Sequence, residues 1–115
     1  MAEKLLDLEG LLKRTMDDKD ITKEILLCYI EESSTMINTL NNFIKLQDYK
    51  KIEEYAHELK GSSISVGAIL ITEISIRIQN AAKNKDIATV SRTMKDLNKA
   101  HNKTLKTINS SEVMI

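Results

Sequence analysis

The sequence predicts an all-α protein, an antiparallel four-helix bundle with one or two short additional N-terminal helices. Apolar residues recur at helical spacing along nearly the whole chain, and no segment alternates in the way that is typical of strands. The chain contains no proline to interrupt a helix. Short polar turns separate four long segments, so consecutive helices should run in opposite directions.

The N-terminal segment, residues 3–16, carries enough apolar residues for one or two short helices, interrupted near Gly10. A polar run from Asp17 to Asp20 ends this segment. Asp20 is expected to cap the next helix, because its carboxylate can accept hydrogen bonds from free N–H groups. That helix should cover residues 21–46.

The helix over residues 21–46 has two apolar faces about 100° apart. We expect the first to face the bundle core and the second to pack against the N-terminal helices. The first face consists of Ile21, Ile25, Tyr29, Met36, Leu40 and Phe43, and the second of Leu26, Ile30, Ile37 and Ile44. Cys28 lies beside the first face, where a packing role is expected.

Three further helices are expected over residues 49–66, 68–83 and 87–108. Asp48 and Asp86 are the predicted caps of the first and last of them, and Gly67 should end the first. Their inward residues should be Ile52, Tyr55, Ala56, Leu59, Ser62, Ser63 and Val66, then Ile71, Ile74, Ile78, Ala81 and Ala82, then Val90, Met94, Leu97, His101, Thr104 and Ile108. Residues 109–115 show no clear pattern. The chain is expected to be one domain, 1–115, with the bundle over about 20–108.

The composition restricts the classes of function. Lys+Arg and Asp+Glu both number 17, so the formal net charge is zero, and aromatic residues are only 3%. A nucleic-acid partner is therefore not expected. Cys28, His57 and His101 are too few to form a clustered metal site, and no apolar run is long enough to span a bilayer. A lone cysteine and the absence of a signal-like N-terminus favour the cytoplasm, with no membrane partner.

Gly61 points to a functional surface, because glycine in a helix interior costs about 1 kcal/mol relative to alanine. With Leu59 at the centre of the buried stripe, His57 lies about 160° away, on the solvent side. His57, Lys60, Gly61 and Ile64 are three, four and seven residues apart, so they share this exposed face.

This face has a chemical interpretation. A neutral imidazole can attack a phosphoryl group, a lysine one turn away can stabilise the phosphoryl oxygens, and a glycine opens access to the ring. The alternative is an ordinary surface histidine beside a solvated lysine. The glycine and the lysine spacing favour the functional interpretation. His101 falls on an inward stripe, so a structural role is expected for it, and Glu53, Glu54 and Glu58 should form a solvated face.

The run His57-Glu58-Leu59-Lys60-Gly61-Ser62-Ser63, followed by Gly67-Ala68, closely resembles the signature of histidine-containing phosphotransfer (HPt) domains. The resemblance implies a four-helix bundle whose His57 takes a phosphoryl group, at Nε2, from a receiver-domain aspartate and passes it to a response regulator. It also implies that Lys60 stabilises the charge, that Gly61 gives access, and that Gln79 lies close to the histidine. Any Mg²⁺ would belong to the receiver partner, so no cofactor is expected on this chain.

The expected partners are the receiver domains of a hybrid sensor histidine kinase and of a response regulator, with the chain itself a monomer. Ile69 and Ile76 should project away from the core and form, with Ile64, an apolar docking surface near His57. The chain has no glycine-rich phosphate loop, so it is not expected to be a kinase. Two alternatives stay open: a helical adaptor that binds receivers without carrying phosphate, and an excised domain of a larger hybrid kinase.

Overall fold

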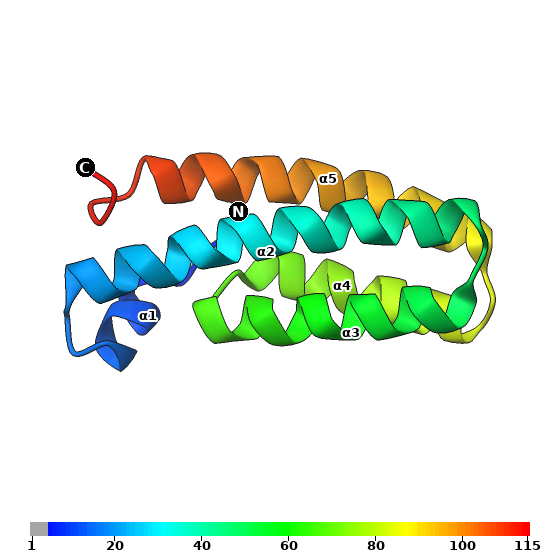
Figure 1. The fold of residues 1–115 in the computed structure, drawn as a ribbon, viewed down its shortest axis with the longest axis horizontal. Coiled ribbons are helices and arrows are strands. Elements are labelled where there is room, and N and C mark those ends of the chain that lie inside the picture. Colours follow the sequence, from blue (N-terminus) through cyan, green and yellow to red (C-terminus); the bar gives the residue numbers. More distant parts are fainter. Residues whose placement is uncertain (1–4) are drawn as a thin grey trace.

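A computed structural model describes residues 5–115, so the expected start of the first helical segment, at residues 3 and 4, lies outside the described part. The helices are α1 (Leu8–Arg14), α2 (Lys19–Lys45), α3 (Tyr49–Val66), α4 (Ile69–Lys83) and α5 (Ile87–Asn109). The helices α2 to α5 run alternately in opposite directions, and α1 lies at one end (Figure 1). The predicted all-α bundle is confirmed, with a single short N-terminal helix among the described residues.

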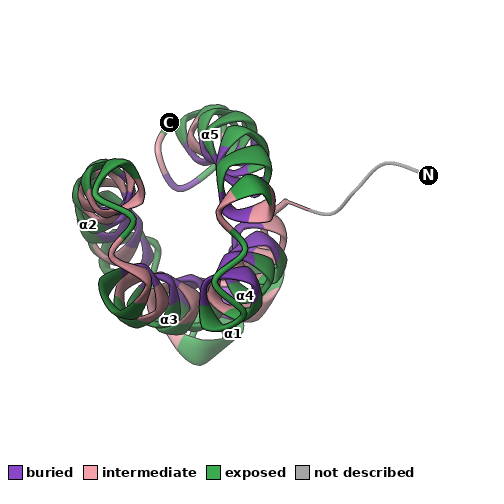
Figure 2. Ribbon diagram, turned by 90° about the vertical axis from the view of Figure 1, so that its right-hand side faces the viewer, coloured by how far each residue is buried: buried purple, intermediate pink, exposed green. Residues whose placement is uncertain are grey.

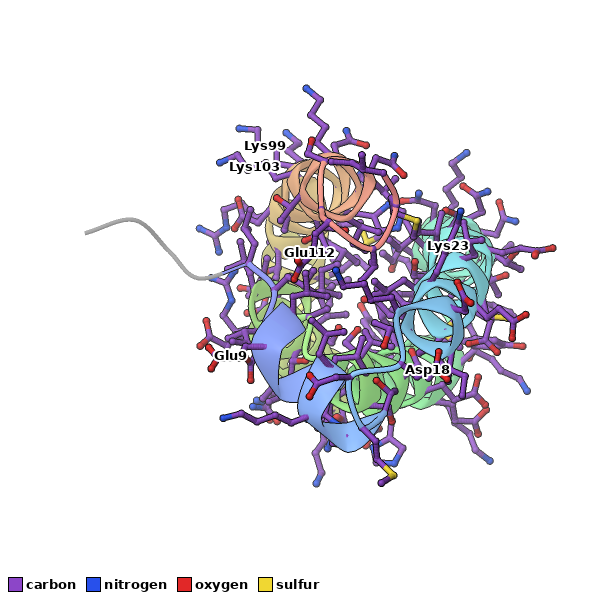
Figure 3. All side chains as sticks on the ribbon, turned by 90° about the vertical axis from the view of Figure 1, so that its left-hand side faces the viewer. Glu9, Asp18, Lys23, Lys99, Lys103 and Glu112 are labelled. Carbon is purple, nitrogen blue, oxygen red and sulfur yellow. The ribbon has the colours of Figure 1, made fainter. Side chains whose placement is uncertain are left out.

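The four long helices surround one core in chain order. Viewed along the bundle, α2, α3, α4 and α5 follow one another around the axis, and their buried faces point inward (Figure 2). Side chains from all four fill the space between the ribbons (Figure 3). Contact between α3 and α4 is the most extensive in the bundle. In the described part of the chain, no helix is long and apolar enough to cross a membrane.

The predicted N-caps of α3 and α5 and the predicted C-terminal end of α3 are confirmed. The Asp48 carboxylate accepts a hydrogen bond from the Lys51 N–H, and the Asp86 carboxylate accepts one from the Thr89 N–H. Gly67 ends α3 in the left-handed conformation, with φ of 78°.

The prediction that Asp20 caps α2 is wrong. The cap is Asp18, whose carboxylate accepts hydrogen bonds from the N–H groups of Asp20 and Ile21. In a run of acidic residues, several side chains could serve as the cap from the sequence alone. The backbone selects Asp18, which adopts extended dihedral angles while Lys19 and Asp20 are already helical.

The expected interruption near Gly10 is also wrong, since α1 runs through Gly10 without a break. The Asp7 carboxylate caps this helix and accepts a hydrogen bond from the Gly10 N–H at 3.1 Å. The segment before α1 pairs with the corner between α3 and α4. The Asp7 N–H donates to the Gly67 carbonyl at 2.8 Å, and the Ile69 N–H donates to the Leu5 carbonyl at 3.1 Å. This pairing fixes α1 against the end of the bundle.

The predicted faces of α2 need correction. Its buried face consists of Thr22, Leu26, Tyr29, Ser33, Ile37 and Leu40. Only Tyr29 and Leu40 of the expected core face belong to it, and Ile21 is 47% exposed. The expected second face does not pack against the N-terminal helix as a unit, because Leu26 and Ile37 lie in the core. Cys28, expected to pack, is exposed.

The inward residues of the other helices largely match the prediction. In α3 the expected set is buried except for Tyr55 and Ser62, which are half-buried, and every residue expected to face inward from α4 and α5 is buried. The C-terminal tail, which shows no pattern in the sequence, packs against the bundle. Val113 is 6% exposed, and the Glu112 carboxylate lies 3.5 Å from the Lys19 ammonium of α2.

Candidate functional site

His57 lies on the solvent side of α3, as predicted. Ala56 and Leu59 on either side of it are fully buried against the core, which turns the His57 side chain outward. His57 is exposed, and so is Gly61 one turn later. A Cβ built on Gly61 would meet no atom within 4 Å, so no packing contact inside the chain requires a glycine there.

Gln79 of α4 reaches the imidazole of His57. Its side-chain Nε2 lies 3.4 Å from the Nδ1 of His57, a long hydrogen bond. Since α3 and α4 run antiparallel, moving along α3 from His57 to Lys60 corresponds to moving back along α4 from Gln79 to Ile76. This register places Ile76, which is 40% exposed, across from Lys60.

The surroundings of His57 differ in charge along the helix axis. On the N-terminal side of the ring, a hollow of about 470 Å³ is lined by Lys50, Glu53, Glu54, His57, Glu58 and Gln79. On the C-terminal side lie Lys60 and the open surface at Gly61. Lys60 is half-buried and forms no ion pair with any residue in 5–115. An anionic group therefore finds three carboxylates together with Lys50 on one side of the ring, and on the other the Lys60 ammonium, which forms no ion pair in residues 5–115.

The three apolar residues expected to form one docking surface lie in two places. Ile64 is 57% exposed and lines a hollow of about 380 Å³ with Gly67 and Ile69. Ile69 lies outside the core, as predicted, but it is half-buried where the N-terminal segment pairs with the α3–α4 corner. Ile76 lies further along α4, beside Lys60.

Sequence reasoning missed the contribution of α1 to this surface. Asp7 and Arg14 line the same hollow as Ile64 and Ile69, and the Arg14 guanidinium donates to the Ser65 carbonyl at 3.0 Å. The only signal in the sequence would have been the apolar pair Leu11 and Leu12, which shows that α1 must pack on something but not on what.

The second histidine has the structural role that was expected. His101 is 8% exposed, and its Nε2 lies 2.9 Å from the Ser33 hydroxyl of α2. Burial lowers the pKa of His101 below its ordinary value. Among residues 5–115, no three potential metal-ligating side chains come together.

Comparison with known proteins agrees with this arrangement. Two solved structures share the fold. An HPT domain from a Shewanella Hpt sensor hybrid histidine kinase has a TM-score of 0.69 at 13% identity, over 93% of this chain and 96% of that chain. A rice protein described as a putative histidine-containing phosphotransfer protein has a TM-score of 0.64 at 20% identity, over 96% of this chain and 85% of that chain.

Similar sequences include multistep phosphorelay regulator 1 of Schizosaccharomyces pombe, 34% identical over 64 residues. That match covers 56% of this chain and 22% of the yeast protein. Histidine-containing phosphotransfer protein 1 of Arabidopsis thaliana is 23% identical over 100 residues, which are 83% of this chain and 65% of the relative. The chain thus spans about a fifth and about two thirds of these two proteins. The Hpt domain family matches residues 24–106, which include α3, α4 and His57. The chain belongs to the Hpt domain family.

Proposed function

We propose that this chain is a phosphorelay intermediate, which takes a phosphoryl group on His57 from a receiver-domain aspartate and passes it to a response regulator. The observation that carries the proposal is the exposed imidazole of His57, with open space at Gly61 and an amide at Nδ1. Membership of the Hpt family supports it.

The transfer needs one lone pair. The Nε2 lone pair of His57 attacks the phosphorus of an aspartyl phosphate, an N–P bond forms, and the bond from phosphorus to the aspartate oxygen breaks. The bonding electrons leave with the carboxylate. The ring then carries a proton on Nδ1 and the phosphoryl group on Nε2, and the reverse sequence delivers the group to the next aspartate.

Gln79 is suited to hold the reactive form of the ring. When the amide nitrogen faces Nδ1, it donates to Nδ1, and a neutral ring then carries its hydrogen on Nε2, where it blocks attack. Rotation of the amide by about 180° presents the oxygen instead, and Nδ1–H then donates to it. This second orientation leaves the Nε2 lone pair free and stabilises the positive ring that transfer produces.

Lys60 is the group best placed to stabilise the phosphoryl oxygens. It lies one turn beyond His57 on the same face and forms no ion pair with a described residue. The hollow on the other side is lined by Glu53, Glu54 and Glu58 with one cation, Lys50, and Glu54 is paired with Lys51, so that side is less favourable for an anion. The phosphoryl group should therefore approach over Gly61 and Lys60, with Ile64, Ile69 and Ile76 in contact with the receiver around it.

The remaining chemistry is assigned to the partner. Any Mg²⁺ is expected on the receiver, and the chain is proposed to transfer phosphoryl groups without kinase activity of its own. The receiver partners of a hybrid sensor kinase and of a response regulator, a monomeric state and the cytoplasmic location all stay predictions.

The test is transfer of radiolabelled phosphate from a phosphorylated receiver domain. We expect the native chain and the His101→Gln variant to become labelled and His57→Gln to stay unlabelled, with native helicity in all three. Binding of the receiver without labelling of the native chain would instead identify an adaptor. Full labelling of His57→Gln would overturn the assignment of the phosphorylated residue.

A further inference from the structure

Helix α5 carries a row of basic side chains on its outer face. It contains five basic residues and one acidic residue in a chain whose formal net charge is zero. At about 100° per residue, the basic residues fall within about 80° of arc, and they span about 21 Å along the axis. The row, all of it exposed, consists of Arg92, Lys95, Lys99, Lys103 and Lys106.

These lysines are not neutralised by the rest of the molecule. In residues 5–115 the acid on this face, Asp96, is paired with Arg77 of α4 at 3.5 Å, and the four lysines of the row form no ion pair. Lys99 and Lys103 project side by side from α5 into solvent (Figure 3). Like charges one turn apart repel each other, so neighbouring lysines of the row do not stabilise one another on the helix.

A shallow groove with an apolar floor lies beside this row, between α4 and α5. Its volume is about 300 Å³. Leu70, Ile74 and Ala100 form the floor, Lys99 and Lys103 line the rim, and the Arg77–Asp96 pair lies at one end. Ile74 and Ala100 are buried, so the half-buried Leu70 supplies the accessible apolar surface of the floor. Together with the basic rim, it favours a ligand that has acidic groups and an aliphatic side chain.

We propose that the groove between α4 and α5 is a second docking surface, which binds an acidic amphipathic protein segment. Glutamates one helical turn apart, about 6 Å along the axis, match the spacing of Lys99 and Lys103, while an aliphatic side chain covers Leu70. This surface is separate from the His57 face, because His57 meets α4 from α3 and the groove lies where α4 meets α5.

Two other anionic partners fit the face less well. Single-stranded nucleic acid is bound through aromatic stacking, and the aromatic residues of the chain, Tyr29, Phe43, Tyr49 and Tyr55, belong to α2 and α3. A membrane surface favours large apolar side chains that can insert among lipids, and in the described chain none of the exposed large hydrophobic residues lies on α5.

The test uses a fluorescein-labelled peptide with glutamates and leucines on one helical face, titrated with the full chain. We expect saturable, salt-sensitive binding that weakens about tenfold in the double variant Lys99→Glu, Lys103→Glu. The matched control is Lys23→Glu, Lys45→Glu, the same charge change on α2, which should bind as the native chain does. Leu70→Gln should weaken binding without changing its salt dependence.

Three results would overturn the proposal. The first is that a peptide with glutamine in place of glutamate binds as tightly as the acidic peptide. The second is that the α2 control variant loses as much affinity as the α5 variant. The third is that the chain binds an oligothymidine or phosphatidylserine vesicles more tightly than the peptide. Transfer to His57 should stay unchanged in the α5 variants. Measuring transfer to His57 alongside peptide binding therefore distinguishes a failure of this proposal from a failure of the phosphorelay assignment.

Discussion

Variants at Gly61 should affect the stability of the chain and its phosphoryl transfer in different ways. A Cβ at this position meets nothing within 4 Å, so Gly61→Ala should raise the free energy of unfolding by about 1 kcal/mol through helix propensity alone. Gly61→Gln should also fold, yet its longer side chain would lie over the path to His57 and slow transfer strongly. Urea unfolding and labelling rates measure the two effects.

Gly67 provides the matched control. Its φ is +78°, and an added Cβ would lie 3.0 Å from the Asp7 carbonyl oxygen. Gly67→Ala should therefore destabilise the chain, by about 1–2 kcal/mol. If Gly61→Ala were destabilising too, or if Gly61→Gln transferred at the native rate, the explanation of Gly61 as an access residue would be wrong.

Gln79 offers a second prediction at the level of single residues. Gln79→Met keeps the length of the side chain but removes the amide that faces Nδ1 of His57. Loss of one hydrogen bond of this kind should slow transfer about two- to tenfold. Nitrogen NMR of the His57 ring should show a smaller Nδ1–H population in this variant than in Gln79→Glu, whose side chain keeps a hydrogen-bond acceptor. Identical tautomer populations in the two variants would exclude a positioning role for Gln79.

The site could be predicted from residue spacing more completely than the docking surface. His57, Lys60 and Gly61 share a face because they lie on one helix, where spacing alone determines direction. The half-buried state of Ile69 depends on a backbone hydrogen bond to Leu5, and the hollow beside Ile64 depends on Arg14 of α1. Both are contacts between distant segments, and no local pattern encodes them.

At the level of the helices, α5 and α2 show when a buried face can be predicted. On α5 the large apolar residues fall mainly on one stripe, which also holds Thr93, His101 and Thr104, and every residue expected to face inward is buried. On α2 apolar residues occur almost all round the helix, and the buried face includes Thr22 and Ser33. Their hydroxyl groups bond to Thr15 and His101, so hydrophobicity alone identified only part of the buried face.

Helix α2 is joined to its neighbours by two buried polar pairs. The Tyr29 hydroxyl lies 2.7 Å from the Ser63 hydroxyl of α3, and Ser33 lies 2.9 Å from His101 of α5. Burial raises the pKa of Tyr29 to about 12, which keeps its hydroxyl neutral. Both pairs lie in the core, so they specify how α2 is aligned against α3 and α5.

The pair with His101 predicts a pH dependence of stability. Burial lowers the pKa of His101 in the folded chain below its ordinary value of 6.5, so the unfolded chain takes up the proton first as the pH falls. The stabilisation is complete above about pH 6.5 and is lost as the pH falls through the folded pKa.

Urea unfolding at about pH 7.5 and about pH 5.5 tests this prediction. The native chain should lose more free energy of unfolding between the two than His101→Gln, whose amide can still bond to Ser33 but does not titrate. If both proteins lost the same free energy of unfolding, His101 would not be the cause of the loss of stability at acidic pH.

At the scale of the whole molecule, the C-terminal tail and the candidate site lie on different faces. The tail packs near α2 and α5 (Figure 1), where Val113 is buried and Glu112 pairs with Lys19. His57 instead is exposed on α3 and faces Gln79 of α4. Removal of residues 110–115 takes away the buried Val113 and the half-buried Met114, and it exposes the apolar surface that these two side chains cover. The truncated chain should lose about 2 kcal/mol of its free energy of unfolding.

The same truncation should leave transfer unchanged at temperatures where the chain stays folded, because no residue of the tail lines the hollow beside His57. His57→Gln should give the opposite result, since an exposed side chain contributes little to packing. Thermal unfolding and labelling rates of both variants measure this separation. A truncated but folded chain that transfers slowly would mean that the alignment of α3 and α4 depends on the whole bundle, and that the site cannot be treated as a feature of two helices alone.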